Sequence, residues 1–414
     1  MVGLVDTLVV GRFAGTLALA GIGLGAVIYG IVYWGFGFLR MSTAGLAAQS
    51  DGASDERAVQ AHLWRAVPLG LFIGVGVVLL QAVILPLILG LYTAGEGIET
   101  EALSYLRARL WGLPATLGGI ALMGWFVGLG QAGRAFRLQL ALNLVNAPLS
   151  VLFVAGLGWG VAGAGLSSAI AEWAGLLTGL WLARGLIRRR GGIRHPTRAE
   201  LLDPAQLRRL GTANVNIFIR TAALVFGFNF FANAAAGQGE VFLAGNHILM
   251  QFVTLIALVL DAYAHTAESA AGAAFGRGER GRFDRAVRLT FGFSGASACV
   301  LAALTLAFGP AVIDLMTPEA EVRASARAFL PFCALVPLVG FAAYHLDGIF
   351  VGATATRAMR DAALLALAVY LGAHALLSPR LGAVGIWTAF LIYYVARAVT
   401  LGARLPGLRA QLRN

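Results

Sequence analysis

The sequence predicts an all-α polytopic membrane protein in which twelve transmembrane helices form two parallel-repeat lobes of six helices each. The first observation is composition: 59% of the 414 residues are hydrophobic, 12% are charged, and the mean hydropathy is +0.79. A soluble domain cannot bury so large an apolar share. The second is that apolar stretches of about 20 residues, the length that crosses a bilayer, recur along the chain. The third is an internal repeat, because the motif at 160–163 returns at 382–385 and the motif at 133–137 returns at 356–360.

The repeat predicts the domain organisation. Pro114 matches Pro337. This pair and the two motifs are each separated by 222 or 223 residues, a nearly constant offset. Parallel repeats of hydrophobic helices are typical of secondary transporters, whose substrate site lies between two lobes that rock against each other. We therefore expect an N-terminal lobe over 1–187, a cytoplasmic linker over 188–206 and a C-terminal lobe over 207–414.

Twelve apolar segments are expected, each long enough to cross the bilayer except the first. The fourth and the tenth contain the repeat-related Pro114 and Pro337, which we expect to bend them. Prolines are tolerated in such segments when neighbouring groups satisfy the freed carbonyl. The segments run over residues 1–13, 17–48, 58–92, 101–132, 135–157, 161–187, 207–235, 240–275, 286–315, 322–352, 358–378 and 383–403.

The first segment is shorter than its repeat partner. Ala20 pairs with Ala244, and at this offset of 224 residue 1 pairs with residue 225, whereas the seventh segment begins near Leu207. An apolar helix of about 13 residues reaches only ~20 Å, less than the ~30 Å of a hydrocarbon core. We expect the natural chain to begin upstream, with an apolar segment that completes the first helix.

The arginines predict the orientation. Every basic residue is an arginine, and the loops on one side of the expected bilayer hold only Arg12 and Arg380. Both termini and the linker are therefore expected in the cytoplasm, with the chain in the inner (plasma) membrane. The net charge of +11 reflects this topology and not nucleic-acid binding, because the arginines are spread over loop ends. The cytoplasmic set comprises Arg57, Arg134, Arg137, Arg188, Arg189, Arg190, Arg194, Arg198, Arg277, Arg280, Arg282, Arg357, Arg360, Arg404, Arg409 and Arg413.

Five acidic residues fall well inside the predicted segments. They are Asp6, Glu172, Asp261, Glu268 and Asp347. A charge at the middle of a bilayer costs several kcal/mol, so such a residue usually has a function. The alternative for each is a structural ion pair. Cys299 and Cys333 have no metal-ligand or disulfide spacing and are expected to be packing residues, and no metal or cofactor site is expected.

The eighth segment carries three titratable side chains on one face. Asp261, His265 and Glu268 lie at i, i+4 and i+7, a spacing that fits a proton, cation or substrate path. The alternative for His265 is a hydrogen-bonded core histidine. Arg220 of the seventh segment reaches about the same depth as Glu268 by helical rise. The sequence therefore predicts a structural Arg220–Glu268 ion pair.

The fifth segment carries a polar stripe of Gln139, Asn143, Asn146 and Ser150. Oxygen-bearing side chains suit a monovalent ion or hydrogen bonding to a drug. The alternative is hydrogen bonding between helices, which we favour for Gln139 and Asn143. Ser150 and Asp6 lie at similar distances, about 10–12 Å, from the outer ends of their helices, so we expect them to share one layer.

Several motifs together resemble one family, the multidrug and toxic compound extrusion (MATE) transporters, and most closely its DinF-like branch. The resemblance covers essentially the whole chain. The motifs are Gly3-Leu4-Val5-Asp6-Thr7 with Gly11, Gly37-Phe38-Leu39-Arg40-Met41, Phe218-Ile219-Arg220-Thr221, Ile248-Leu249-Met250-Gln251-Phe252, Leu260-Asp261-Ala262-Tyr263-Ala264-His265, and the run from Leu346-Asp347-Gly348 to Gly352-Ala353-Thr354.

The resemblance implies a two-lobe antiporter that exports amphipathic, often cationic, small molecules in exchange for protons or sodium ions. Asp6 matches the family's coupling aspartate and Asn146 the asparagine beside it. Ser150 stands where the family usually has a second aspartate, and Asn216 where DinF-like relatives often have an acidic residue. Both departures remove negative charge, so we expect protons rather than sodium to be the coupling ion. No cofactor is implied, and one two-lobe monomer contains a complete pathway.

A lipid-linked oligosaccharide flippase of the same broad superfamily is the alternative function. Such a protein favours a strongly cationic cavity, whereas the expected membrane segments offer few arginines beyond Arg40 and Arg220. An enzyme is not expected, because the chain has no metal-binding His-Glu-x-x-His or Gly-x-Gly-Asp pattern.

Overall fold

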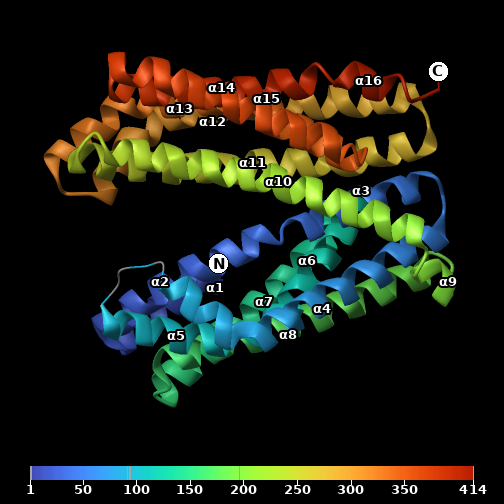
Figure 1. Cartoon of the computed structure of the whole chain (residues 1–414), viewed down its shortest axis with the longest axis horizontal. Coiled ribbons are helices and arrows are strands. Elements are labelled where there is room, and N and C mark those ends of the chain that lie inside the picture. The colour runs from blue at the N-terminus through green and yellow to red at the C-terminus, as the bar shows by residue number, and fades with distance from the viewer. Residues whose placement is uncertain (1, 91, 93–94, 195, 414) are drawn as a thin grey trace. The chain divides into compact units, whose positions relative to one another are not determined.

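The computed structural model describes residues 2–90, 92, 95–194 and 196–413, and these residues form helices joined by short connections (Figure 1). No strand occurs among them. The helices of the first half are α1 (Val2–Phe13), α2 (Gly15–Gly35), α3 (Phe38–Gly52), α4 (Glu56–Leu89), α5 (Glu96–Leu110), α6 (Leu113–Gly128), α7 (Ala132–Val151) with a π-helical turn (Leu152–Gly156), α8 (Gly160–Arg189) and α9 (Arg198–Leu201). Those of the second half are α10 (Pro204–Ala236), α11 (Glu240–Arg277), α12 (Arg280–Met316), α13 (Ala320–Gly352), α14 (Thr356–Leu381), α15 (Ala383–Gly402) and α16 (Leu405–Arg409).

The lengths and composition of these helices confirm an all-α polytopic membrane protein. In the described chain, 10 helices are long and apolar enough to cross a membrane. The number of candidate spans rises to 11 when the bent pair α5 and α6 is counted as one span. The pair α2 and α3 counts as a single stretch over Gly15–Gly52. With the 12-residue α1, these elements fit the predicted twelve-segment arrangement.

The predicted bend of the fourth segment is confirmed. The chain turns by 57° between Leu110 and Leu113. Pro114 lies in the first turn of α6, where its missing N–H needs no helical partner. Gly112 lies at the break, and a Cβ there would be 2.7 Å from the Cα of Ala169. Glycine therefore lets the bend approach α8 closely. The tenth segment differs, because α13 continues unbroken as one helix past its proline.

The chain divides into two compact units. Unit 1 contains Met1–Ala47 and Asp55–Arg208, and unit 2 contains Ala48–Ser54 and Arg209–Asn414. The end of α3 therefore belongs to unit 2, a departure from the lobe boundaries expected from the repeat. The amide of Gln49 donates to the carbonyl oxygen of Gly352 at 3.0 Å. This hydrogen bond joins the end of α3 to the end of α13.

Unit 1 is built around α5 and α8. Helix α8 packs along α5, α6 and α7, and α2 packs on α5. Trp125 and Phe126 fill a core between α4, α6 and α8, and the Trp125 indole donates to the carbonyl of Val59 at 2.8 Å. This packing brings side chains from α1, α2, α5, α7 and α8 into one buried layer.

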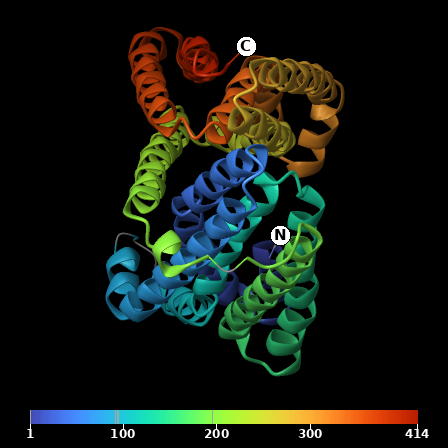
Figure 2. The same ribbon diagram turned by 90° about the vertical axis from the view of Figure 1, so that its right-hand side faces the viewer.

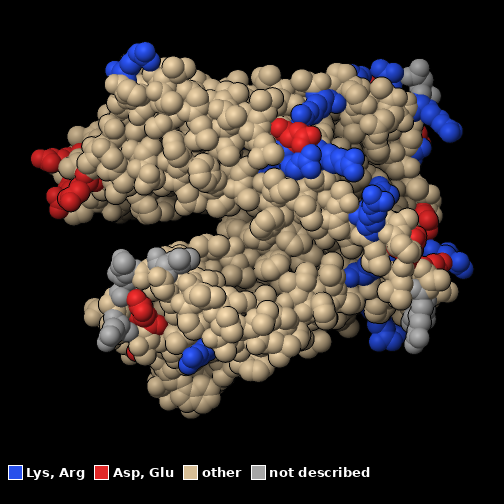
Figure 3. All heavy atoms as spheres, in the orientation of Figure 1, with Lys and Arg blue, Asp and Glu red and all other residues tan. Residues whose placement is uncertain are grey.

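Unit 2 has an aromatic core. The rings of Phe231 and Phe390 stack with centroids 4.2 Å apart, and Trp387 meets Phe231 edge to face at 5.0 Å. Much of the visible outer surface is uncharged (Figure 3). Large apolar side chains are exposed there, including Leu315 at 88%, as expected for helices that face lipid.

Candidate functional site

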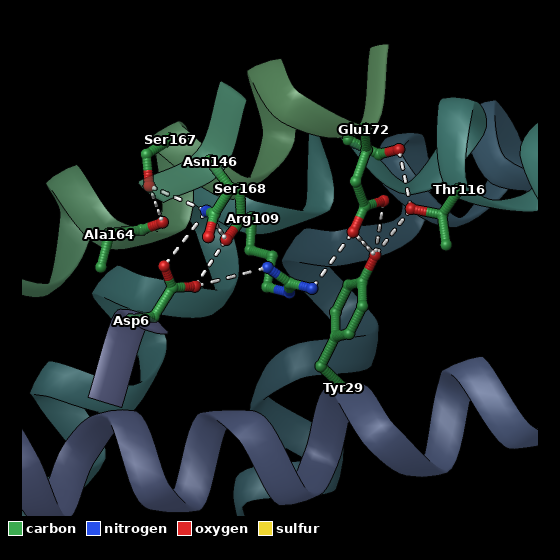
Figure 4. A network of polar contacts seen from close by, with 10 residues as sticks. Asp6, Tyr29, Arg109, Thr116, Asn146, Ala164, Ser167, Ser168 and Glu172 are labelled. Atoms are coloured by element: carbon green, nitrogen blue, oxygen red, sulfur yellow. Dashed lines mark hydrogen bonds and ion pairs between the residues drawn. The ribbon is translucent and has the colours of Figure 1, made fainter. Parts of the chain in front are cut away.

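Asp6 lies at the centre of a buried polar layer in unit 1. Helix α1 carries Asp6, which is fully buried. The Asn146 amide of α7 donates to its Oδ1 at 3.2 Å, and the Ser168 hydroxyl of α8 donates to its Oδ2 at 2.5 Å (Figure 4). The Asn146 amide also donates to Ser168 at 3.0 Å. The structure thus brings together Asp6 and Asn146, as the family resemblance implied, and adds Ser168.

Arg109 of α5 connects Asp6 to a second carboxylate. Its Nη1 lies 3.7 Å from Asp6 Oδ2, and its Nη2 donates to Glu172 Oε1 at 3.1 Å. The guanidinium also lies over the ring of Tyr29, 4.0 Å from the centroid. Arg109 is 7% exposed. Sequence reasoning missed this residue, although an arginine inside a predicted span is a signal for a buried partner.

Glu172 completes the other end of the layer. The Tyr29 hydroxyl lies 3.3 Å from Glu172 Oε1 and 3.2 Å from Oε2, and 2.8 Å from the Thr116 hydroxyl (Figure 4). Asp6 is therefore not alone in this layer, because Glu172 shares Arg109 with it. Two carboxylates around one guanidinium carry a formal charge of −1 when all three groups are ionised.

The layer contains polar atoms that the rest of the described chain does not satisfy. The Oδ1 of Asn146, the Nη1 and Nε of Arg109 and the hydroxyl of Ser150 are buried and make no hydrogen bond with the described residues. Ser150 itself is fully buried on α7. Buried polar groups are nearly always hydrogen-bonded. Four buried atoms without a hydrogen bond, all close to Asp6, therefore indicate a functional site more than a structural one.

The remaining residues of the fifth-segment stripe stay outside this network. The Asn143 amide donates to the carbonyl of Gln139 on its own helix at 2.9 Å. The bond is local to α7, so it does not provide the predicted contact between helices. Of the four predicted polar positions, Asn146 and Ser150 are the two that are buried.

Unit 2 contains a second charge cluster, centred on Asp347 of α13. Arg220 of α10 pairs with Asp347 Oδ2, and Arg397 of α15 donates to the same oxygen at 2.8 Å. The Arg397 guanidinium lies 5.5 Å from the ring centroid of Tyr344 and 5.6 Å from that of Tyr394. Asp347 is thus held by two cations, one of which the sequence analysis did not identify.

The sequence predicted an Arg220–Glu268 ion pair, whereas the structure pairs Arg220 with Asp347. Helical rise gave both residues a similar depth but not the faces of their helices. Helix α10 packs its aromatic side chains against α14 and α15, whereas Glu268 lies buried on α11, where its backbone closely approaches Gly352 of α13. Arg220 is therefore next to Asp347 instead. Asp261 and His265 are half-buried on α11.

Asn216 has a structural role in unit 2. Its amide donates to the Thr356 hydroxyl at 3.3 Å, and its carbonyl accepts from Arg360 at 2.9 Å. The amide provides both a donor and an acceptor here, which a carboxylate cannot do. The asparagine that stands where DinF-like relatives often have an acidic residue thus forms hydrogen bonds that join α10 to α14.

The buried arginines also revise the comparison with a flippase. Arg109 and Arg397 join Arg40 and Arg220 inside predicted membrane segments, so the sequence analysis counted too few. Arg109 faces two carboxylates, and Arg220 and Arg397 share Asp347. Because these cations are paired, they do not form the strongly cationic cavity that a phosphate-linked substrate favours.

A two-unit bundle of membrane-spanning helices with buried charge networks defines a polytopic membrane protein of the transporter class. A family model described as MatE matches residues 1–152 and 217–378, more than half of the chain. The chain belongs to the MatE family.

Individual relatives agree with this assignment. The chain is 32% identical over 407 residues to DNA damage-inducible protein F of Escherichia coli, with 97% of this chain and 87% of that protein covered. It is 24% identical over 439 residues to multidrug resistance protein MdtK of Edwardsiella ictaluri, covering 100% and 92%. A crystal structure of MATE in the bent conformation shares the fold with a TM-score of 0.86, at 20% identity and covering 99% and 91% of the two chains.

Proposed function

We propose that the chain is a multidrug antiporter that exports amphipathic or cationic small molecules in exchange for protons, and that Asp6 binds the coupling proton. The observation that carries this proposal is the buried group of Asp6, Arg109 and Glu172. Membership of the MatE family and similarity to a protein named for multidrug resistance support the transport class.

The charge of this group favours a single proton. Asp6 and Glu172 carry two negative charges and Arg109 one positive charge, so one bound proton makes the group neutral. A net charge buried in a low-dielectric layer is costly, and a neutral group avoids that cost. Glu172 has two hydrogen-bond donors, the Tyr29 hydroxyl, which lies between its two oxygens, and the charged guanidinium of Arg109. Asp6 accepts from the neutral Asn146 and Ser168 but not from Arg109, which lies 3.7 Å away, so we assign the proton to Asp6.

A mechanism follows from what protonation does to the contacts. A proton on Asp6 removes its attraction for Arg109, which then pairs with Glu172 alone. Loss of the proton restores a net charge of −1, which favours a cation or water nearby. If the protonated and deprotonated layers favour opposite conformations, proton binding and cation binding exclude each other in the way that exchange requires.

Asp347 is less suited to the coupling role. Its charge is offset by Arg220 and Arg397, so a third cation gains little there. We assign Asp347, with Asp261 and His265, to a substrate or proton path in unit 2. Sodium coupling is less suited to the Asp6 layer, because Ser150 supplies a hydroxyl where a second aspartate would add charge.

We also propose that the protein lies in the inner membrane with both termini in the cytoplasm and functions as a monomer. Arginines at alternate loop ends support the orientation. The presence of two compact units in one chain supports the monomer, and no further partner is needed beyond the bilayer and the transported small molecule.

Transport in proteoliposomes tests the proposal. Efflux of a fluorescent cationic dye should follow an imposed proton gradient and be unaffected by a sodium gradient of the same size. Dependence on sodium alone would reject proton coupling. Transport of a lipid-linked oligosaccharide without dye efflux would favour the flippase instead.

A further inference from the structure

A cavity of about 430 Å³ lies between α7 and α8 in unit 1, away from the Asp6 layer. The two helices pack along each other (Figure 2). Five arginines line the cavity, two from the first turns of α7 and three from the last turns of α8, together with Trp181, Leu182 and Gly185. The arginines are Arg134, Arg137, Arg184, Arg188 and Arg189.

No carboxylate neutralises these arginines. Among the described residues, none of the five has an acidic partner within 4.0 Å. Arg134 bonds to the side chain of Gln131, and Arg137 donates to the carbonyl of Gly133 at 3.2 Å, both neutral acceptors. The side chains of the three α8 arginines make no hydrogen bond or ion pair within the described chain. Five like charges around one cavity repel each other unless an anion binds.

Two arginines near other helix ends show the pairing that the five cavity arginines lack. Arg190, directly after the three α8 arginines, pairs with Glu56 at 2.5 Å. In unit 2, Arg409 pairs with Asp284 at 2.6 Å. The distinctive feature of the cavity is that five arginines line it together and none of them pairs with a carboxylate.

The surroundings of the cavity indicate which anion binds. Trp181, which lines it, is 71% exposed, and the next turns of the same helices expose Phe136 (65%), Leu140 (42%) and Leu177 (62%). These are apolar faces of membrane-spanning helices, so the cavity lies where the lipid-facing surface ends. Tryptophan is enriched at that level of a membrane. Basic pockets between membrane helices bind anionic lipid headgroups.

We propose that this cavity binds the phosphodiester headgroup of an anionic phospholipid, with the acyl chains along the exposed apolar faces of α7 and α8. Arginine suits this ligand because its planar guanidinium donates two parallel hydrogen bonds to one phosphate. The cavity volume lies in the range of small-molecule sites. Helix α7 carries Asn146 and α8 carries Ser168, so a bound lipid would also brace the two helices that hold Asp6.

Native mass spectrometry of the detergent-solubilised chain tests the proposal. Phosphatidylglycerol and phosphatidylcholine with identical acyl chains are added separately. The native protein should retain phosphatidylglycerol preferentially. Arg184→Gln, Arg188→Gln and Arg189→Gln together should weaken that binding roughly 100-fold, and each alone about fivefold, since every arginine near an anionic lipid contributes a similar increment. The single variants keep the test usable if the triple variant does not fold.

A matched control removes the same charge elsewhere. Arg277, Arg285 and Arg288 are exposed arginines of α11 and α12 in unit 2 that make no side-chain hydrogen bond or ion pair within the described chain. Their combined change to glutamine should leave phosphatidylglycerol binding within about twofold of native. Equal loss in this control, or equal retention of the two lipids by the native protein, would overturn the proposal. Displacement by inorganic phosphate at the concentration of the lipid would also overturn it, because the ligand would then be a soluble anion.

Discussion

Arg109→Gln tests the central feature of the candidate site, the single cation between two buried carboxylates. In the native protein Arg109 donates to Glu172 at 3.1 Å, lies 3.7 Å from Asp6 and covers the ring of Tyr29 at 4.0 Å. Without it, Glu172 keeps only the Tyr29 hydroxyl, and Asp6 keeps Asn146 and Ser168. With the proton on Asp6, Glu172 is then a buried negative charge without a cation.

The expected loss of stability is large. Removing one partner of a buried ion pair costs about 3–5 kcal/mol, because the remaining charge is left in a low-dielectric interior. In a unit of this size that cost lowers the thermal midpoint by on the order of 10 °C. The measurement is thermal unfolding of the purified chain in detergent, followed by tryptophan fluorescence.

A double-mutant cycle separates the ion pair from general damage. Glu172→Gln in the Arg109→Gln background removes the unpaired charge and should recover at least about 2 kcal/mol of the loss. Arg107→Gln is the matched control, because Arg107 is an exposed arginine on the same helix, and its change should stay within about 0.5 kcal/mol of native. Additive losses in the double variant would refute the coupled charge group.

Three further substitutions test the assignments of Asp6, Ser150 and Asp347. Asp6→Asn should abolish dye efflux driven by a proton gradient with little change in thermal midpoint, because the amide keeps the shape but cannot titrate; native efflux would rule out Asp6 as the coupling group. Ser150→Asp adds a carboxylate to the same buried layer, so efflux should become dependent on sodium, and an unchanged sodium response in a folded variant would contradict the shared layer. Asp347→Asn leaves two buried arginines without a carboxylate and should cost about 3–5 kcal/mol in unfolding experiments. A further Arg220→Gln change should restore part of that stability, whereas Asp361→Asn should have little effect, because the Asp361 side chain is 45% exposed and its pair with Arg360 is screened by solvent.

The sequence by itself determined the class of protein and much of its organisation. Hydropathy alone indicates membrane helices, because a bilayer requires about 20 apolar residues per span whatever the tertiary fold. The internal repeat indicated two related halves, and Pro114 indicated the bend now measured as 57°. Asp6 and Asn146 were selected as site residues because buried polar groups in lipid are costly, and the structure joins them at 3.2 Å.

The partners of buried charges were decided only by the tertiary structure. Helical rise gives the depth of a residue but not the neighbouring helix that its side chain meets, so Arg220 was assigned to Glu268 when it pairs with Asp347. For the same reason the link from Asp6 through Arg109 to Glu172 was missed, since it joins α1, α5 and α8 across 166 positions of sequence. An ion pair depends on a few ångströms between side chains, and only the packing of helices around one another sets that distance.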